Sequence, residues 1–166
     1  IRSCLVGSEM CIRDRVEGYT DVISLFQIGI KNVVSSSGTS LTNNQIKLIS
    51  RYTKNITILF DGDEAGLSAS LRGMDLILEN DLNVKIVSLP KNEDPDSLSK
   101  KLNESKFKEF LKSRETDLIN YKVNLLNENY KNDPVKKSDM IFDIVKSISK
   151  IPNSIKRSVF IKETSN

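Results

Sequence analysis

Hydrophobic and polar positions between residues 16 and 90 alternate between two periods. Apolar side chains recur every three or four residues in three stretches, which predicts helices over residues 20–30, 42–52 and 64–79. Short runs rich in β-branched residues predict strands over residues 31–34, 55–60 and 83–90, the first of which runs into a small-residue loop over residues 35–38. Strands and helices that alternate at this spacing predict a doubly wound α/β fold with a parallel sheet.

Individual residues predict where these elements begin, end and pack. Gly29 is a typical C-terminal cap for the first helix, and Thr42 with Gln45 is a capping box at the start of the second. Each helix is expected to turn an apolar face toward the core. These faces comprise Val22, Ile23, Leu25 and Phe26 in the first helix and Ile46, Ile49 and Tyr52 in the second.

Strand signals cease after Pro95, and the rest of the chain has the pattern of successive amphipathic helices. Pro134 and Pro152 mark breaks between them, and Asn153 is expected to open the last helix. Such helices must bury their apolar faces against one another or against the sheet. We therefore predict a division into residues 16–98, an α/β domain, and residues 99–166, a helical subdomain.

The first fifteen residues differ in texture from the rest of the chain. Their run LVGSEMCIRD resembles the translation of a sequencing adapter, so residues 1–15 are expected to be non-native and are set aside from the fold. A genuine strand around residues 10–12 is the alternative. Setting the segment aside removes both cysteines, and with them disulfides and thiol catalysis. We expect the native chain to begin earlier and to continue past Asn166.

Composition limits the chemistry that the chain can perform. The 166 residues are 38% hydrophobic and 28% charged, which is ordinary for a soluble globular protein, and we expect a cytoplasmic location. No apolar run approaches the roughly 20 residues that cross a bilayer, so no membrane partner is expected. Histidine is absent, which removes the commonest general base and zinc ligand. Acid–base or metal chemistry must therefore rest on carboxylates.

Acidic residues follow three of the expected strands. Glu17 lies where a first strand would join the first helix. Asp61 and Asp63 follow the strand NITILF directly, and Asp94 and Asp96 follow the next strand. Because reactive groups of a parallel sheet gather at the carboxyl ends of its strands, these five carboxylates are expected to share one edge.

A cluster of like charges needs a positive partner, because close carboxylates repel each other and raise each other's pKa. Ligation by oxygen alone, without histidine or cysteine, points to Mg²⁺, with Mn²⁺ as a possibility. Magnesium in such a site binds substrate phosphates, which indicates phosphoryl or nucleotidyl transfer or hydrolysis. Taken singly, Asp61-Gly62-Asp63 could also be a turn, and Asp94 and Asp96 a proline turn with a helix cap.

Four stretches resemble the Toprim domain of bacterial DnaG-type DNA primases in order and spacing. They are VEGYTDVISL, SSGTSLT, ILFDGDEAGLSASLRGMDL and VSLPKNEDPDSL. The later IPNSIKRSVFIKE resembles the helical subdomain that closes the primase catalytic core. The resemblance covers residues 16–166 and implies a Toprim-type Rossmann-like sheet with flanking helices, followed by an all-helical subdomain.

The resemblance implies a role for each acidic residue. Glu17, Asp61 and Asp63 match residues that bind catalytic Mg²⁺, and Asp94 and Asp96 match further acidic positions of that site. The family's reaction is Mg²⁺-dependent synthesis of short RNA primers on single-stranded DNA during replication. Asp21 is expected to support the ligands or to favour the helix N-terminus through the macrodipole.

The resemblance also implies partners and missing parts. Ribonucleoside triphosphates and a single-stranded DNA template are the expected substrates. Four basic residues could form a rim that contacts the phosphates of these substrates, or could belong to ordinary solvated surface: Lys47, Arg51, Lys54 and Arg72. Zinc is expected only in a missing N-terminal module. The replicative helicase of the primosome is expected to bind through a missing C-terminal domain. We therefore expect the fragment to bind divalent metal without priming DNA.

Two other functions use the same fold. A Toprim nuclease or topoisomerase would employ the same acids, although a topoisomerase also needs a nucleophilic tyrosine on a separate domain. A non-catalytic Toprim nucleic-acid-binding module is disfavoured because no acidic position has been lost. The phrase LPKNEDPDSL and the helical tail favour primase over nuclease.

Overall fold

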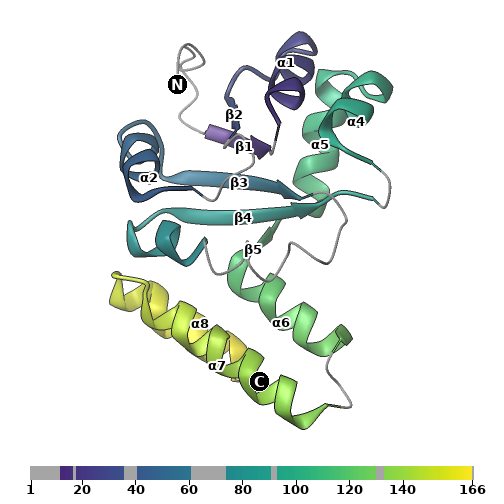
Figure 1. Ribbon diagram of the computed structural model, residues 1–166. Coiled ribbons are helices and arrows are strands. Elements are labelled where there is room, and N and C mark those ends of the chain that lie inside the picture. The colour runs from purple at the N-terminus through teal and green to yellow at the C-terminus, as the bar shows by residue number, and fades with distance from the viewer. Residues whose placement is uncertain are drawn as a thin grey trace.

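A computed structural model describes residues 12–16, 18–35, 41–60, 74–90, 93–129 and 133–165. At its centre is a five-stranded sheet with the order β2-β1-β3-β4-β5 (Figure 1). The strands are β1 (Ile12–Val16), β2 (Val33–Ser35), β3 (Asn55–Phe60), β4 (Asn83–Ser88) and β5 (Thr116–Asp117). The first four are parallel, and β5 pairs antiparallel with β4. The predicted α/β class with a parallel sheet and flanking helices is confirmed.

One face of the sheet is covered by three helices: α1 (Tyr19–Gln27), α4 (Pro95–Lys101) and α5 (Glu104–Arg114). Leu25 of α1 and Phe107 of α5 are fully buried against Leu59 and Val87, which the two central strands direct toward this face. Because strand side chains alternate, the neighbours Ile58 and Ile86 face the opposite side. Strands β3 and β4 therefore each contribute side chains to two separate cores, one on each face of the sheet.

The opposite face is covered by α2 (Asn43–Ile49), helical residues 74–79, α6 (Leu118–Asn129), α7 (Pro134–Ser149) and α8 (Ser154–Thr164). Ile46 and Met74 meet Leu118 and Ile144 in one buried cluster on the sheet. No helix in the described part of the chain is long and apolar enough to cross a membrane.

Helices α5 and α6 pack on the sheet, and α7 and α8 pack mainly on α6 and on each other; Figure 1 shows α5 behind the sheet and α6 to α8 along its other face. Phe107 and Leu118 each belong to a core that also holds strand residues. The expected boundary between residues 98 and 99 falls inside α4, and the domain division itself stays a prediction. Burial of the later helices is incomplete: α5, α6 and one side of α7 bury apolar residues, whereas α8 buries none, and Phe142, Val145 and Ile155 stay exposed.

Two strands differ from the sequence-based expectation. Thr116 and Asp117 were expected to be helical but form β5, because Ile86 and Lys85 of β4 offer backbone groups with which they pair. Residues 12–15, set aside with the first fifteen, form most of β1 between β2 and β3. A strand is held by backbone hydrogen bonds, so its place in the sheet depends less on side-chain identity than on the chain leading into α1.

Several local predictions are confirmed. The backbone of Gly29 has φ +99°, the left-handed conformation that favours glycine after a helix. The Thr42 hydroxyl accepts from the backbone N–H of Gln45, and the side-chain Oε1 of Gln45 accepts from the backbone N–H of Thr42. Asn153 caps α8 through bonds from the N–H groups of Ile155 and Lys156.

The expected apolar faces are only partly correct. Ile23 and Phe26 are 53% and 47% exposed, so the prediction that they belong to the buried face of α1 is wrong. The side of α1 that packs in the core holds Val22, Leu25 and Ile28, and Ile23 lies about 200° around the helix from Leu25. Tyr52 is also exposed, because α2 ends at Ile49 and the chain then turns away toward β3.

Candidate active site

The carboxyl ends of the parallel strands meet at one edge of the sheet. Val16, the last residue of β1, pairs with Ser35, and Phe60, the last residue of β3, pairs with Ser88. Helices α1 and α4 begin at the same edge and pack against each other, as their position at the arrowheads in Figure 1 shows. In the described strands and helices, the residues that follow the parallel strands are therefore brought together at this edge of the sheet.

Three of the predicted catalytic residues lie outside the described residues. Glu17 follows the end of β1, and Asp61 and Asp63 follow the end of β3. Their assignment as metal ligands stays a prediction. The strands that precede them do end at the expected edge of the sheet.

Asp94 and Asp96 are described, and both lie at the start of α4. The Asp94 carboxylate accepts from the N–H of Ser97 at 2.6 Å, and the Ser97 hydroxyl accepts from the N–H of Asp94 at 3.1 Å. Asp94 is thus the N-cap of α4, the role that its position beside Pro95 indicates. Its second carboxylate oxygen makes no hydrogen bond within the described segments.

Asp96 ties α4 to α1. Its carboxylate accepts a short hydrogen bond from the Ser24 hydroxyl of α1 and one from Lys100 Nζ at 2.6 Å. The Lys100 ammonium, and after it the Ser24 hydroxyl, hold the pKa of the Asp96 carboxyl below its usual value. Asp96 therefore stays ionised and fixed in position.

Asp21 completes a group of three carboxylates between α1 and α4. It accepts from the N–H of Gly18 at 3.1 Å. Burial raises the pKa of Asp21, the Gly18 hydrogen bond lowers it in part, and the nearby charges of Asp94 and Asp96 raise it again. Three carboxylates thus lie together at this corner, and their charges repel one another.

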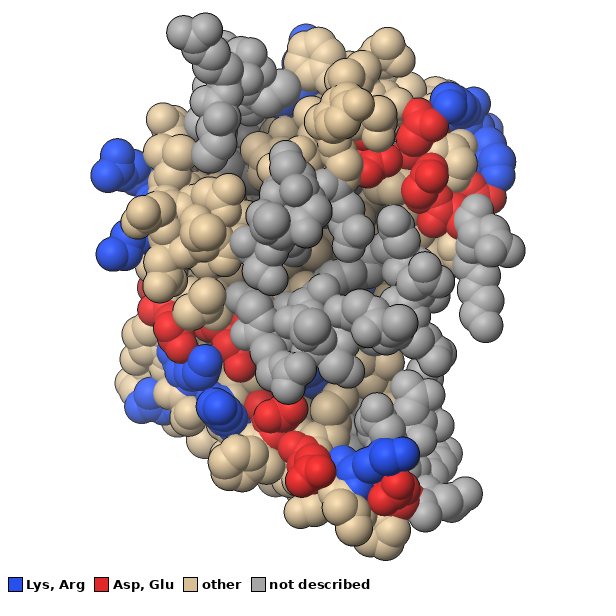
Figure 2. All heavy atoms as spheres, viewed as in Figure 1, with Lys and Arg blue, Asp and Glu red and all other residues tan. Residues whose placement is uncertain are grey.

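The charge distribution agrees with that conclusion. Figure 2 shows acidic side chains gathered at the end of the molecule where α1 and α4 lie, with basic side chains at the margin on this face. On α4, Lys100 and Lys101 are exposed and pair with Asp96 and Glu93. The described acids alone include no group of three that could hold a metal ion. A complete metal site would need the carboxylates of Glu17, Asp61 and Asp63 as well.

The predicted basic rim is not adjacent to this edge. Lys54 immediately precedes β3, and its carbonyl accepts from Asn83 at the start of β4, so it lies at the amino edge of the sheet. The six residues of β3 separate the two edges by about 20 Å. Lys47 and Arg51 are exposed on and after α2, near the same amino edge. Arg72 lies outside the described residues.

Sequence reasoning missed the residues that hold the described acids. Ser24 lies one turn after Asp21 on α1, and Lys100 one turn after Asp96 on α4. The second spacing is a common ion-pair signal within one helix and could have been used. The link between Ser24 and Asp96 spans 72 residues and depends on how α1 packs on α4, which no local pattern reveals.

Comparison with known proteins decides the family. The Toprim-like family matches residues 15–99, half of the chain. These residues contain β2, β3, β4 and the end of β1. The chain belongs to the Toprim-like family. Its sequence is 38% identical to a DNA primase of Clostridium acetobutylicum over 154 residues, or 91% of this chain and 25% of that protein. The chain thus spans about a quarter of the length of this relative.

Solved structures extend the similarity beyond the Toprim-like region. A DNA primase domain from Pseudomonas aeruginosa superimposes with a TM-score of 0.80 and 29% identity, covering 95% of this chain and 51% of that one. A DnaG primase catalytic domain bound to single-stranded DNA gives the same TM-score and identity over 96% of this chain and 53% of that one. The predicted resemblance to DnaG-type primases, over both the α/β sheet and the following helices, is confirmed.

Proposed function

We propose that this chain is the Toprim-like part of a DNA primase, together with the helices that follow it. Its function there would be Mg²⁺-dependent transfer of ribonucleotides onto a growing RNA primer, on a single-stranded DNA template. The observation that carries the proposal is the extent of the similarity. It covers more than nine-tenths of the chain and continues through α5 to α8, beyond the region that the Toprim-like family matches.

The donor set at the carboxyl edge fits magnesium. It consists of carboxylates alone, which is the ligand type that Mg²⁺ prefers, and burial, followed by the charges of Asp94 and Asp96, raises the pKa of Asp21 beside it. Glu17, Asp61 and Asp63 would hold the ions, with Asp94 and Asp96 completing the acidic surround. Bound Mg²⁺ would neutralise charge on the triphosphate and favour attack by a primer hydroxyl.

The described residues would contribute position and charge. The capping bonds of Asp94 fix the first turn of α4, and the Ser24 hydroxyl holds Asp96 against α1. Lys100 occupies one Asp96 oxygen, but it is a flexible, exposed side chain on the same helix and can move aside for a cation. These bonds keep carboxylates from two helices at one edge before any metal binds.

A chimera tests the proposal directly. Residues 16–166 would replace the matching segment of the Clostridium acetobutylicum DNA primase, and the product would be assayed for RNA primers on single-stranded DNA. We expect the chimera to make primers and the 166-residue chain alone to make none while still binding Mn²⁺. A folded chimera that cleaves or relaxes DNA but makes no primer would contradict the proposal and favour a nuclease or topoisomerase. Robust primer synthesis by the isolated chain would overturn the expectation that it needs its flanks.

A further inference from the structure

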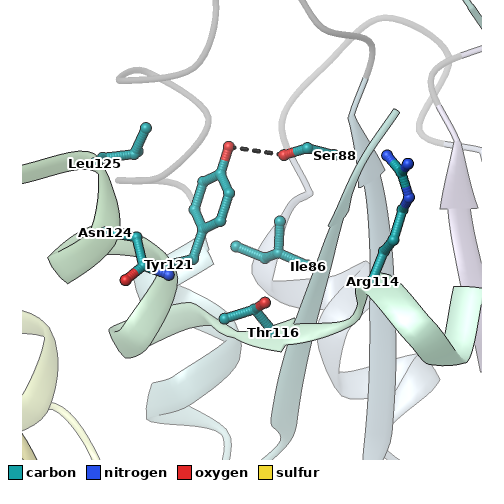
Figure 3. A pocket seen from close by; sticks show the side chains of 7 residues that line it. All are labelled: Ile86, Ser88, Arg114, Thr116, Tyr121, Asn124 and Leu125. Carbon is teal, nitrogen blue, oxygen red and sulfur yellow. Dashed lines mark hydrogen bonds between the residues drawn. The ribbon is translucent and has the colours of Figure 1, made fainter. Parts of the chain in front are cut away.

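A cavity of about 360 Å³ lies beside the carboxyl end of β4, on the side that faces α6 (Figure 3). It is separate from the acidic corner between α1 and α4. Strand β4 contributes Ile86 and Ser88, and α6 contributes Tyr121, Asn124 and Leu125. Arg114, at the end of α5, and Thr116 of β5 complete the lining.

The cavity exists because β5 is shorter than β4. The two strands pair only at Lys85 with Asp117 and at Ile86 with Thr116. The last residue of β4, Ser88, therefore lies beyond the residues of β4 that pair with β5. The gap is bounded by Arg114 on the α5 side and by the first two turns of α6 on the other.

Arg114 gives the cavity a positive charge. None of the ion pairs of the described residues involves Arg114, and none of the described residues that line the cavity is acidic. Its guanidinium lies 4.9 Å from the centre of the Phe110 ring, a cation–π contact that holds it without neutralising it. The cavity thus offers one oriented cation to an anion.

The rest of the lining combines polar and apolar groups. The hydroxyls of Tyr121 and Ser88 are hydrogen-bonded at 3.0 Å and turn toward each other in Figure 3. The Asn124 side chain is exposed and can both donate and accept. Ile86, Leu125 and the Tyr121 ring supply apolar surface. A ligand that fits must have an anionic group and a flat, partly polar body.

We propose that this cavity binds one nucleotide of a single-stranded nucleic acid, with its phosphodiester on Arg114 and its base toward Tyr121 and Asn124. The volume is in the range of small-ligand sites, which begin near 300 Å³. A phosphodiester carries one charge and matches one guanidinium, whereas a nucleoside triphosphate carries several and needs more cations. Base contact with an aromatic ring and phosphate contact with arginine are the usual means of holding single strands.

The position of the cavity agrees with this occupant. Ser88 pairs with Phe60, the residue before Asp61, so the cavity lies at the same edge as the proposed metal ligands. A strand held there would pass close to the site of nucleotidyl transfer. The inference rests on the proposed function, because it takes the bound strand to be the template or the primer.

The test compares Arg114→Gln with Lys112→Gln in the 166-residue chain. Both residues are exposed near the end of α5, but Lys112 does not line the cavity. Binding of a fluorescent oligothymidylate would be measured by anisotropy at several salt concentrations. We expect Arg114→Gln to weaken binding by about three- to tenfold and to lower the salt slope by about 0.7, as loss of one phosphate contact does. Lys112→Gln should change neither quantity.

A second measurement does not depend on affinity. An oligonucleotide with 4-thiothymidine would be photocrosslinked to the unaltered chain, and we expect the crosslinked peptide to contain Tyr121 or Asn124. Equal effects of the two substitutions, no binding at all, or crosslinks only elsewhere would overturn the proposal. So would weaker binding of ATP by Arg114→Gln with unchanged binding of the oligonucleotide. Neither readout involves catalysis, so a failure of primer synthesis in the chimera would be a separate result.

Discussion

Asp75 and Lys122 form a buried ion pair that joins helical residues 74–79 to α6. Lys122 Nζ lies 3.1 Å from an Asp75 carboxylate oxygen, and the two residues are 2% and 5% exposed. The Ser147 hydroxyl of α7, itself fully buried, lies 2.5 Å from Lys122 Nζ and 2.7 Å from the same Asp75 oxygen. Three segments that cover one face of the sheet are thus tied by one polar cluster.

Removing one charge of this pair should strongly destabilise the fold. Loss of one partner of a buried ion pair costs about 3–5 kcal/mol, because the other charge remains buried without compensation. Among the described residues, Asp75→Ala leaves the Lys122 ammonium with only the Ser147 hydroxyl. Lys122→Met leaves Asp75 with the Ser147 hydroxyl and with Lys150, whose Nζ is 3.7 Å away. We therefore expect Asp75→Ala to cost more than Lys122→Met.

Removing both charges should cost much less. Replacing a buried ion pair with apolar residues of similar volume is often neutral or stabilising. We expect the double variant Asp75→Leu with Lys122→Met to unfold within about 1 kcal/mol of the unaltered chain. The Ser147 hydroxyl keeps a partner, because it also lies 2.8 Å from the Asp143 carbonyl.

Urea unfolding of the 166-residue chain, followed by circular dichroism, measures these free energies. Lys108→Met is the matched control, because it removes an exposed ion pair with Glu104 and should leave the midpoint unchanged. Single substitutions that cost less than about 1 kcal/mol would refute the reasoning, as would a double variant that loses as much as the sum of the single ones.

Three further predictions concern the acidic corner and a helix cap. The folded-state pKa of Asp21 is raised, so its charge opposes folding above that pKa. Asp21→Asn should therefore stabilise the metal-free chain at pH 7, as measured by thermal unfolding. The gain in stability should fade as the pH falls and should be smaller when Mg²⁺ is present. Lys100→Gln should raise the pKa of Asp96 toward its ordinary value in an NMR titration, and an unchanged pKa would remove Lys100 as its cause. Asn153→Ala should cost about 1 kcal/mol in urea unfolding and Asn153→Asp little, because only the latter keeps an acceptor for the α8 N-terminus.

The parallel sheet could be predicted from sequence because local patterns encode its parts. The β-branched run before Asp61 and the cap residues Thr42 and Asn153 act within a few positions of themselves, and the structure has each as predicted. Strand β5 could not be predicted, because two residues of ordinary helical pattern pair with β4 only after the chain has folded back. The prediction of burial on α1 failed for a different reason, because Ile23 and Phe26 do not share the side of the helix on which Val22, Leu25 and Ile28 pack.

The candidate site was predictable at the level of topology. Parallel strands end at one edge of the sheet, so the end of β4, which precedes Asp94 and Asp96, lies at the same edge as the ends of β1 and β3. Glu17 and Asp61 directly follow β1 and β3 in the sequence. The contacts between distant segments at this edge do not follow from any local rule. Ser24 with Asp96, and Tyr121 with Ser88, join residues that are 72 and 33 positions apart.

The charge in β1 illustrates a conflict that sequence rules detect. Arg13, Asp14 and Arg15 occupy a strand between two parallel neighbours, where apolar runs are usual. A non-native origin of residues 1–15 stays a prediction. Replacing residues 12–15 with the corresponding residues of a relative should raise the urea midpoint of the chain if that origin is correct.

The central claim is that carboxylates at the carboxyl edge serve nucleotidyl transfer, and primer synthesis by the chimera measures it most directly. Glu17→Gln, Asp61→Ala and Asp63→Ala would be compared with Asp139→Ala, an exposed acid on α7. We predict that each of the first three lowers the rate on the order of 100-fold or more while the control stays unchanged. Full activity in all three would contradict the account.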